Sequence, residues 1–269
     1  MVLEITAKNV EMDMKSRVGP PGPPASTTAS LGKKGNDRRN VIDSCMRDYN
    51  GSTSFIRTLT GFLTDRERAA FISHAESVGF DRTQQRETRD CAHRQQWRIA
   101  FEDSEIAASI FHRVLPYIPE EIDNAKPHSC STNIRIYRYD VGDSFGCHFD
   151  DTISVEIPTR LEDAEVASSQ ERGKKGSKNK KSMNLRRRLV GWTKLTILIY
   201  LNGYDYPVDG GETRFYLGEK GGEIFVSFSP SSSSGDLLMH GHGNRCLLHE
   251  AAPVTGGKKY ILRTDVVYL

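Results

Sequence analysis

The segment YDVGDSFGCHFD, residues 139–150, decides the fold because it ends a strand pattern, turns through two glycines and then presents two metal-binding side chains. Residues two apart on an extended backbone point to the same face. His148 and Asp150 should therefore aim at one point, with Phe149 turned the other way. An imidazole and a carboxylate, joined by a distant histidine, make the 2-His-1-carboxylate set that leaves positions open on a redox-active iron. A His-x-Asp triplet alone is weak evidence for a metal site, because it recurs by chance. A third ligand elsewhere in the chain is needed to support the assignment.

Strand patterns lie on both sides of this segment. From Asn133 the sequence alternates, with Ile134 and Ile136 on one face. Residues 195–201 (LTILIYL) are almost continuously apolar, which is typical of a strand buried on both faces. Further strands are expected, between Gly-rich turns, at 214–217, 224–228, 236–239, 246–249 and 259–268. Helices followed by many short strands predict an α+β protein with a double-stranded β-helix (jelly roll) core and N-terminal supporting helices.

Two helices are predicted before these strands. Thr64 and Glu67 have the spacing of a capping box, and apolar residues follow at helical intervals from Phe71 to Val78. A second helix is expected from about Ser104, again with one apolar side, and Pro116 ends it.

Composition and length indicate one soluble domain with a tail. The chain has 269 residues, 37% hydrophobic and 27% charged. No run approaches the roughly 18 apolar residues of a membrane span, and residues 1–17 do not resemble a secretory signal. Residues 1–50, with GPPGPP at 19–24, predict a disordered tail before a domain over 55–269. Five widely spaced cysteines favour reduced thiols, and so the cytoplasm or the nucleus.

A basic insertion is predicted at 156–190. Within it, Glu171–Arg188 holds nine basic residues and one acidic residue. Three interpretations stay open: a solvated disordered insertion, a patch that attracts an acidic protein or nucleic acid, or a nuclear localisation signal. No aromatic residue interrupts the segment, so base stacking is not expected of it and only an electrostatic role is supported.

The third metal ligand should come from the C-terminal third, which offers His240, His242 and His249. His249 is favoured because it ends the apolar run at 246–248, where a strand end, a tight turn and a returning cationic strand are expected. The other two histidines flank Gly241 in a predicted loop, where solvated or structural roles are the usual ones.

Two cations on the last strand are candidates for binding an acidic cosubstrate. Lys259 and Arg263 share one face of the strand expected at 259–268. A cation near an iron with open positions suits a ligand that chelates the metal at one end and carries a carboxylate at the other. Lys259 is favoured as the anchor, although both side chains could line the pocket.

Four motifs together, HFD, TILIYLN, GGET and HEAAPVTGGKKY, resemble the Fe(II)/2-oxoglutarate-dependent dioxygenases of the prolyl 4-hydroxylase-like group. The resemblance covers about Thr58 to Leu269 and is strongest from Asn133 onwards. It implies that Fe(II) is held by His148, Asp150 and His249. It also implies that Lys259 binds the distal carboxylate of 2-oxoglutarate, with Tyr139 and Tyr200 beside it. Arg263 departs from the small or amide residue usual in collagen and hypoxia-sensing prolyl hydroxylases, which leaves the substrate open.

The activity implied by this resemblance is oxidative hydroxylation of a C–H bond with O2, with ascorbate as reductant, yielding succinate and CO2. A protein or peptide side chain, prolyl first, is the expected substrate. Two alternatives are oxidative demethylation of nucleic acid and a catalytically silent jelly-roll binding module. The sequence predicts no membrane partner and does not define the oligomeric state.

Overall fold

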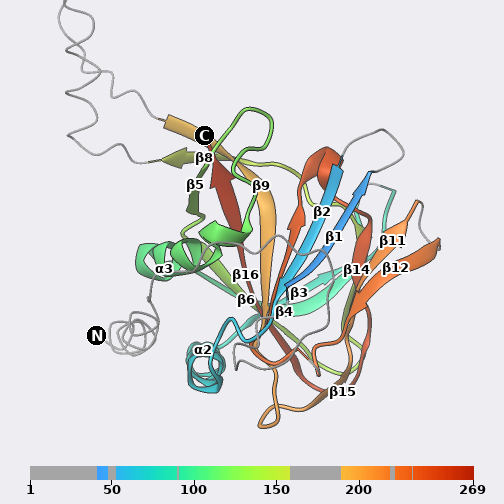
Figure 1. Cartoon of the computed structure of the whole chain (residues 1–269). Helices are drawn as coiled ribbons and strands as arrows, with labels where there is room; N and C mark the ends of the chain where they lie inside the picture. The colour runs from blue at the N-terminus through green and yellow to red at the C-terminus, as the bar shows by residue number, and fades with distance from the viewer. Residues whose placement is uncertain (1–40, 48–52, 90, 158–188, 219–221, 232) are drawn as a thin grey trace, which may run out of the picture.

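A computed structural model describes residues 41–47, 53–89, 91–157, 189–218, 222–231 and 233–269 (Figure 1). Most of the predicted tail at 1–50 and of the predicted basic insertion at 156–190, including Glu171–Arg188, lies outside the described residues. Strand β1 (Val41–Arg47) falls within the predicted tail and pairs with β2 (Thr53–Leu59). The sheet therefore begins before Phe55, where the sequence pattern placed the first ordered residues.

The described chain is mostly antiparallel β-structure with few helices. Two α-helices, α2 and α3, cover Asp65–Val78 and Ser104–Val114, and short 3-10 turns cover Leu115–Tyr117 and Gly243–Arg245. After β1 and β2 the strands are β3 Asp81–Gln85, β4 Arg94–Glu102, β5 Pro127–Cys130, β6 Asn133–Tyr139, β7 Ser144–His148, β8 Ser154–Ile157, β9 Leu189–Tyr200, β10 Val208–Gly210, β11 Thr213–Leu217, β12 Glu223–Phe228, β13 Leu237–Gly241, β14 His249–Ala251, β15 Val254–Gly257 and β16 Lys259–Tyr268.

One large sheet connects nearly all of these strands, in the order β1-β2-β13-β9-β16-β6-β4-β7-β14-β11-β12. Although β11 and β13 are far apart in this order, the rings of Phe215 and His240 lie 5.3 Å apart. The hydroxyl of Tyr200 on β9 likewise donates to Thr213 Oγ1 on β11 at 2.9 Å. The sheet therefore curls back on itself, as in a half-barrel, and brings its two ends to one interior (Figure 1).

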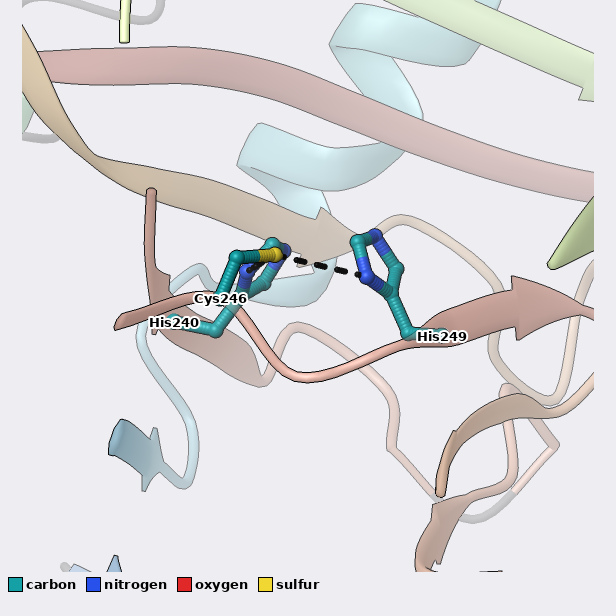
Figure 2. Close-up of side chains that lie close together, drawn as sticks. All are labelled: His240, Cys246 and His249. Carbon is teal, nitrogen blue, oxygen red and sulfur yellow. Dashed lines mark hydrogen bonds between the residues drawn. The ribbon is translucent and has the colours of Figure 1, made fainter. Parts of the chain in front are cut away.

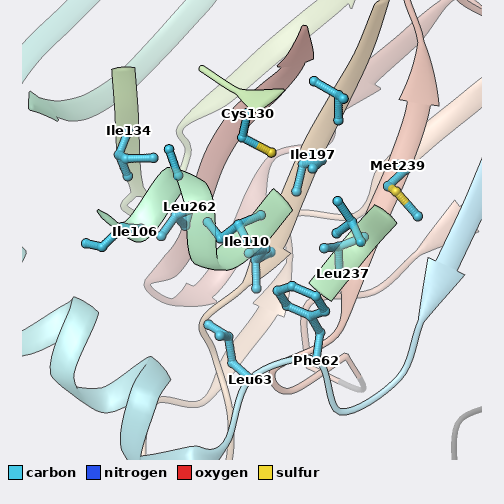
Figure 3. Packing of buried hydrophobic residues seen from close by; sticks show 14 of the residues in the cluster. Phe62, Leu63, Ile106, Ile110, Cys130, Ile134, Ile197, Leu237, Met239 and Leu262 are labelled. Carbon is cyan, nitrogen blue, oxygen red and sulfur yellow. The ribbon is translucent and has the colours of Figure 1, made fainter. Parts of the chain in front are cut away.

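Both helices pack on the outer face of the curled sheet. The capping box predicted for α2 is present: Thr64 Oγ1 accepts from the Glu67 amide while the Glu67 carboxylate accepts from the Thr64 amide. Figure 3 shows Ile110 of α3 packed against the sheet, together with Phe62 from the segment before α2. Neither described helix is long and apolar enough to cross a bilayer.

The inner face of the sheet carries polar and charged residues in rows across neighbouring strands. Lys259 on β16 lies opposite Tyr139 on β6. Four residues further along β16, and therefore on the same face, Arg263 lies opposite Arg135 on β6 and Leu198 on β9. Because side chains alternate between faces, the intervening residues supply the apolar core on the helix side, and the functional side chains gather inside the curl.

Candidate active site

The curl brings His148, Asp150 and His249 together. His148 ends β7 and His249 opens β14, and the two residues are paired in register, with ring centroids 4.2 Å apart. Asp150 follows two residues after β7; its Oδ1 lies 3.8 Å from His148 Nε2 and its Oδ2 lies 4.0 Å from His249 Nε2. One donor atom from each of the three lies within 4.8 Å of the others. Phe149 between them is exposed, as the two-residue period predicted.

The surroundings of His249 differ from the sequence prediction in two ways. His249 begins a strand, whereas the apolar run before it at 246–248 is not a strand. The cationic strand β16 does not return beside it but pairs with β6 and β9. Residues 252–258 instead contain β15, which pairs with β10 in a separate small sheet. The final strand therefore joins the large sheet several positions away from β14.

Both metal-facing imidazoles are held with a free nitrogen towards the cluster. His148 Nδ1 lies 2.8 Å from the Gly146 carbonyl and His249 Nδ1 lies 3.0 Å from the Leu247 carbonyl, so each Nδ1 donates and each Nε2 keeps its lone pair. Burial lowers the pKa of His148 to about 3 and lowers the pKa of His249. Neutral imidazoles at pH 7 are the form that binds a metal.

Asp150 is prepared to bind through one oxygen. Its Oδ2 accepts from Thr196 Oγ1 at 2.7 Å and lies 3.0 Å from an Arg263 nitrogen. Burial alone would raise the pKa of this carboxyl, but Arg263 and the nearby imidazoles hold the pKa well below its ordinary value. Since Oδ2 is already engaged, Oδ1 is left for a metal. A one-oxygen carboxylate with two imidazoles leaves coordination positions open, so this donor set fits ferrous iron.

The cluster opens into a cavity of about 300 Å³ that also contains Lys259. The Lys259 side chain is 1% exposed, and its Nζ has no hydrogen-bond partner among the described residues. Burial lowers its pKa to about 7, and only the Glu212 carboxylate opposes that shift. A buried, unpaired ammonium is costly and is stabilised by an anionic ligand, so the cavity fits a carboxylate-bearing molecule.

The two predicted tyrosines lie on the two strands that flank β16, Tyr139 on β6 opposite Lys259 and Tyr200 on β9 opposite Ile261. Tyr139 lines the cavity, with Lys259 Nζ 5.2 Å from its ring centre, which is within cation–π distance. Tyr200 is buried behind the cavity wall, where its hydroxyl donates to Thr213, a residue that does line the cavity. Burial raises the pKa of both phenols, so both stay protonated as donors.

Arg263 also lines the cavity, but its charge is already paired. Its guanidinium contacts Asp150, lies 3.4 Å from Asp265 Oδ1 and donates to Thr196 at 3.2 Å. Although burial lowers the pKa of Arg263, Asp150 and Asp265 raise it overall. Arg135 forms a second ion pair with Asp265. Arg263 therefore orients a metal ligand, whereas Lys259 has its charge available.

His240 and His242, the alternatives for the third ligand, are both buried, which fits the structural and not the solvated of the two predicted roles. The predicted loop is wrong for His240, which lies on β13. His242 contacts the hydroxyls of Thr193 and Thr196. His240 lies on β13 with Nε2 3.6 Å from Asp150 Oδ2. Figure 2 shows that His240 also forms a separate cluster with Cys246 and His249.

Sequence reasoning did not assign Arg94 and Gln96 of β4 to the site. Arg94, Gln96 and Arg98 alternate along this strand and all line the cavity. The Arg94 guanidinium lies 4.0 Å from the centre of the Phe145 ring, which stacks in turn on His148 at 3.6 Å. The two-residue spacing of Arg94, Gln96 and Arg98 was the available signal, but residues 81–96 showed no clear period as a whole.

No protein-family model matches the chain, and no curated protein matches it. Among solved structures it is similar to a viral collagen prolyl hydroxylase from Paramecium bursaria Chlorella virus-1 (16% identity, 79% of this chain and 95% of that one, TM-score 0.48). It is also similar to a Pseudomonas putida prolyl-4-hydroxylase (13%, 78% and 91%, TM-score 0.49) and to a Trichoplax adhaerens prolyl hydroxylase in complex with a hypoxia inducible factor peptide (14%, 78% and 82%, TM-score 0.49). At these values the likeness assigns the chain neither a family nor a substrate, and its function has to be argued from the site itself.

Proposed function

We propose that this chain is an Fe(II)- and 2-oxoglutarate-dependent dioxygenase that hydroxylates a C–H bond. The observation that carries the proposal is one cavity that holds both the His148–Asp150–His249 donor set and the unpaired, buried ammonium of Lys259. A metal with open positions and a distant cation together suit a short dicarboxylate that chelates the metal through its 2-oxo acid end. When bound, iron, 2-oxoglutarate and O2 supply oxidative decarboxylation to succinate and CO2 with oxygen insertion into the substrate.

The protein's own contribution is positioning and a neutral, dry site. Backbone carbonyls fix the two imidazole tautomers, and Arg263 with Thr196 fixes the carboxylate of Asp150. Lys259 would bind the far carboxylate of the cosubstrate, and the buried wall would exclude bulk water. The three proposed metal ligands are held by their neighbours before ligands arrive, which lowers the cost of assembling the site.

The finer parts of the proposal concern substrate, fold type and location. The proposed substrate is a protein or peptide side chain, a proline first, and the curled antiparallel sheet would be a double-stranded β-helix of the prolyl 4-hydroxylase-like type. Ascorbate would serve as reductant. The described cysteines 91, 130, 147 and 246 form no disulfide with one another, which fits the proposal of a cytoplasmic or nuclear protein.

Succinate release tests the assignment directly. Purified protein with Fe(II), 2-oxoglutarate and ascorbate should release succinate slowly even without substrate, because turnover is not fully coupled to hydroxylation. The variants His148→Ala and His249→Ala should release none. Equal succinate from both variants and from the unmodified chain would remove the site assignment, and tight metal binding without turnover would favour a silent binding module.

Oxidative demethylation of nucleic acid is a second candidate. Arg94 and Arg98 both line the cavity and form no ion pair among the described residues, so they could attract a phosphate. Salt-sensitive binding of methylated oligonucleotides with loss of methyl groups would support this candidate. Salt-sensitive binding that leaves the methyl groups in place would exclude it.

A further inference from the structure

A second group of metal-binding side chains lies beside the first. The group consists of three buried side chains: His240 on β13, His249 on β14, and Cys246 from the segment before β14 (Figure 2). Cys246 Sγ lies 3.7 Å from His249 Nδ1 and 3.9 Å from His240 Nδ1. The first group uses the other nitrogen of His249, Nε2, so the two groups meet on opposite edges of a single ring.

These separations match a tetrahedral site. Zinc binds thiolate sulfur at about 2.3 Å and imidazole nitrogen at about 2.0 Å, which places sulfur and nitrogen about 3.6 Å apart at tetrahedral angles. The two S–N separations therefore need to close by only a few tenths of an ångström. A thiolate with two imidazoles is also a donor set that suits soft cations such as Zn²⁺, not Mg²⁺ or Ca²⁺.

We propose that His240, Cys246 and His249 form a second metal site, for a thiophilic cation such as Zn²⁺, and that this site and the His148–Asp150–His249 site cannot both be filled. The thiol proton of Cys246 would pass to solvent when the cation binds. The existence of the second site does not depend on the proposed dioxygenase activity. One consequence does rest on it: a zinc ion in the second site would displace iron and so inhibit turnover.

Exclusion follows from the chemistry of His249. A neutral imidazole has one N–H and one lone pair. In the arrangement seen here, Nδ1 donates to the Leu247 carbonyl at 3.0 Å and the lone pair on Nε2 faces Asp150. If the ring stays neutral, binding a metal through Nδ1 moves the proton to Nε2, which removes that nitrogen from the iron site. Only loss of the proton, to give an imidazolate, would let one ring hold both metals.

The position of His240 supplies an independent reason to expect a ligand. Its side chain is 1% exposed and its Nε2 has no hydrogen-bond partner among the described residues. At present Nδ1 donates to the Gly241 carbonyl at 3.2 Å, which leaves the bare Nε2 facing Asp150 Oδ2 at 3.6 Å. Binding of a cation at Nδ1 would move the proton to Nε2, so that this buried nitrogen would present an N–H to the carboxylate. His240 and His249 both line the cavity, so the second group, like the first, borders it.

Cadmium provides the probe, because a Cd²⁺–thiolate bond gives an ultraviolet charge-transfer band that nitrogen and oxygen ligands do not. Under argon, the unmodified chain should develop this band on titration with Cd²⁺, and Cys246→Ser should lose it. The matched control is Cys147→Ser, whose thiol adjoins His148 but belongs to neither group; it should keep the band. His240→Asn should weaken the band, and intact Fe(II) binding by Cys246→Ser would show that this variant is folded.

Exclusion is measured by counting metals. The unmodified chain should bind one metal per chain from a mixture of Fe(II) and Cd²⁺, with iron released as the thiolate band grows. His148→Ala and Asp150→Ala should lose iron yet keep the band. Two metals bound at once, no band in the unmodified chain, or a full band in Cys246→Ser would overturn the proposal. Failure of the dioxygenase assignment would instead appear as absent succinate with the band unchanged.

Discussion

Replacing Lys259 with methionine should change stability and ligand binding in opposite directions. The side chain is fully buried, and its pKa falls from 10.5 to about 7 because burial disfavours the charged form. A shift of that size corresponds to about 5 kcal/mol at most between the charged and neutral forms. Replacement of buried ion pairs by well-packed apolar residues is often neutral or stabilises a protein by about 1–4 kcal/mol, and Lys259 has no hydrogen-bond partner among the described residues to lose. We therefore expect Lys259→Met to unfold at higher urea concentration than the unmodified chain when no ligand is present.

The same substitution should nearly abolish cosubstrate binding. Losing one partner of a buried, hydrogen-bonded charge pair costs about 2–5 kcal/mol, which is roughly a 30-fold or larger rise in the KM for 2-oxoglutarate. Lys258→Met is the matched control, since Lys258 is the exposed neighbour of Lys259 on the chain. That variant should change neither quantity.

A pH series separates this explanation from a simple packing effect. The folded chain releases the Lys259 proton near pH 7 while the unfolded chain holds it to about pH 10.5, so the unfolded state binds more protons between these values. Below pH 7 Lys259 is charged in both states, and the free energy of unfolding carries the full cost of burying that charge. Between pH 7 and 10.5 the free energy of unfolding rises with pH, by up to about 1.4 kcal/mol per pH unit. Lys259→Met should lose this contribution. A destabilised variant with unchanged KM would refute the reasoning.

Three further predictions follow from the described contacts. Arg263→Gln should destabilise the metal-free protein by about 3–5 kcal/mol, because Asp150 and Asp265 lose a buried cation; in urea unfolding, Mn²⁺ should recover more stability in this variant than in the unmodified chain. Metal-free protein should lose stability below about pH 6.5. The imidazoles of His148 (pKa about 3), His240, His242 and His249 stay neutral in the folded state but bind protons in the unfolded state. An unchanged urea midpoint between pH 7 and pH 5 would contradict this prediction. Gly257→Ala should lower the melting temperature more than Gly61→Ala, since both glycines have positive φ but only at Gly257 would a methyl group overlap the Pro207 carbonyl.

Local patterns predicted the elements that depend on local physics. The alternation from Asn133 to Tyr139 became β6 with the same bounds. Residues 195–200 of the predicted apolar run lie in β9 and are buried on both faces, except for the half-buried Leu198. The capping box at Thr64 also formed. In each case the signal lies within one helix or strand, where side-chain period and hydrogen-bond donors determine the outcome.

The rest depends on which strands become neighbours, and the sequence does not contain that information in local form. The sequence favoured His249 as the third ligand but left His240 and His242 as alternatives. Only the pairing of β14 with β7 shows that His249 lies opposite His148. The role of Asp265 emerges only from the pairing of β16 with β9, which sets it beside Thr196. Non-local register of this kind is fixed by the whole sheet.

If the proposed function is right, the charges of the site imply that the proposed metal and cosubstrate bind cooperatively. Without ligands, Asp150 and Asp265 are balanced by Arg263 and Arg135, so a divalent cation alone adds two positive charges beside a guanidinium. A dicarboxylate alone would find Lys259 but no metal to chelate. Bound together, the two ligands cancel each other's charge and Lys259 gains its missing partner. Each ligand should therefore tighten the other by the same factor, and Lys259, although it does not touch the metal, should account for part of that coupling.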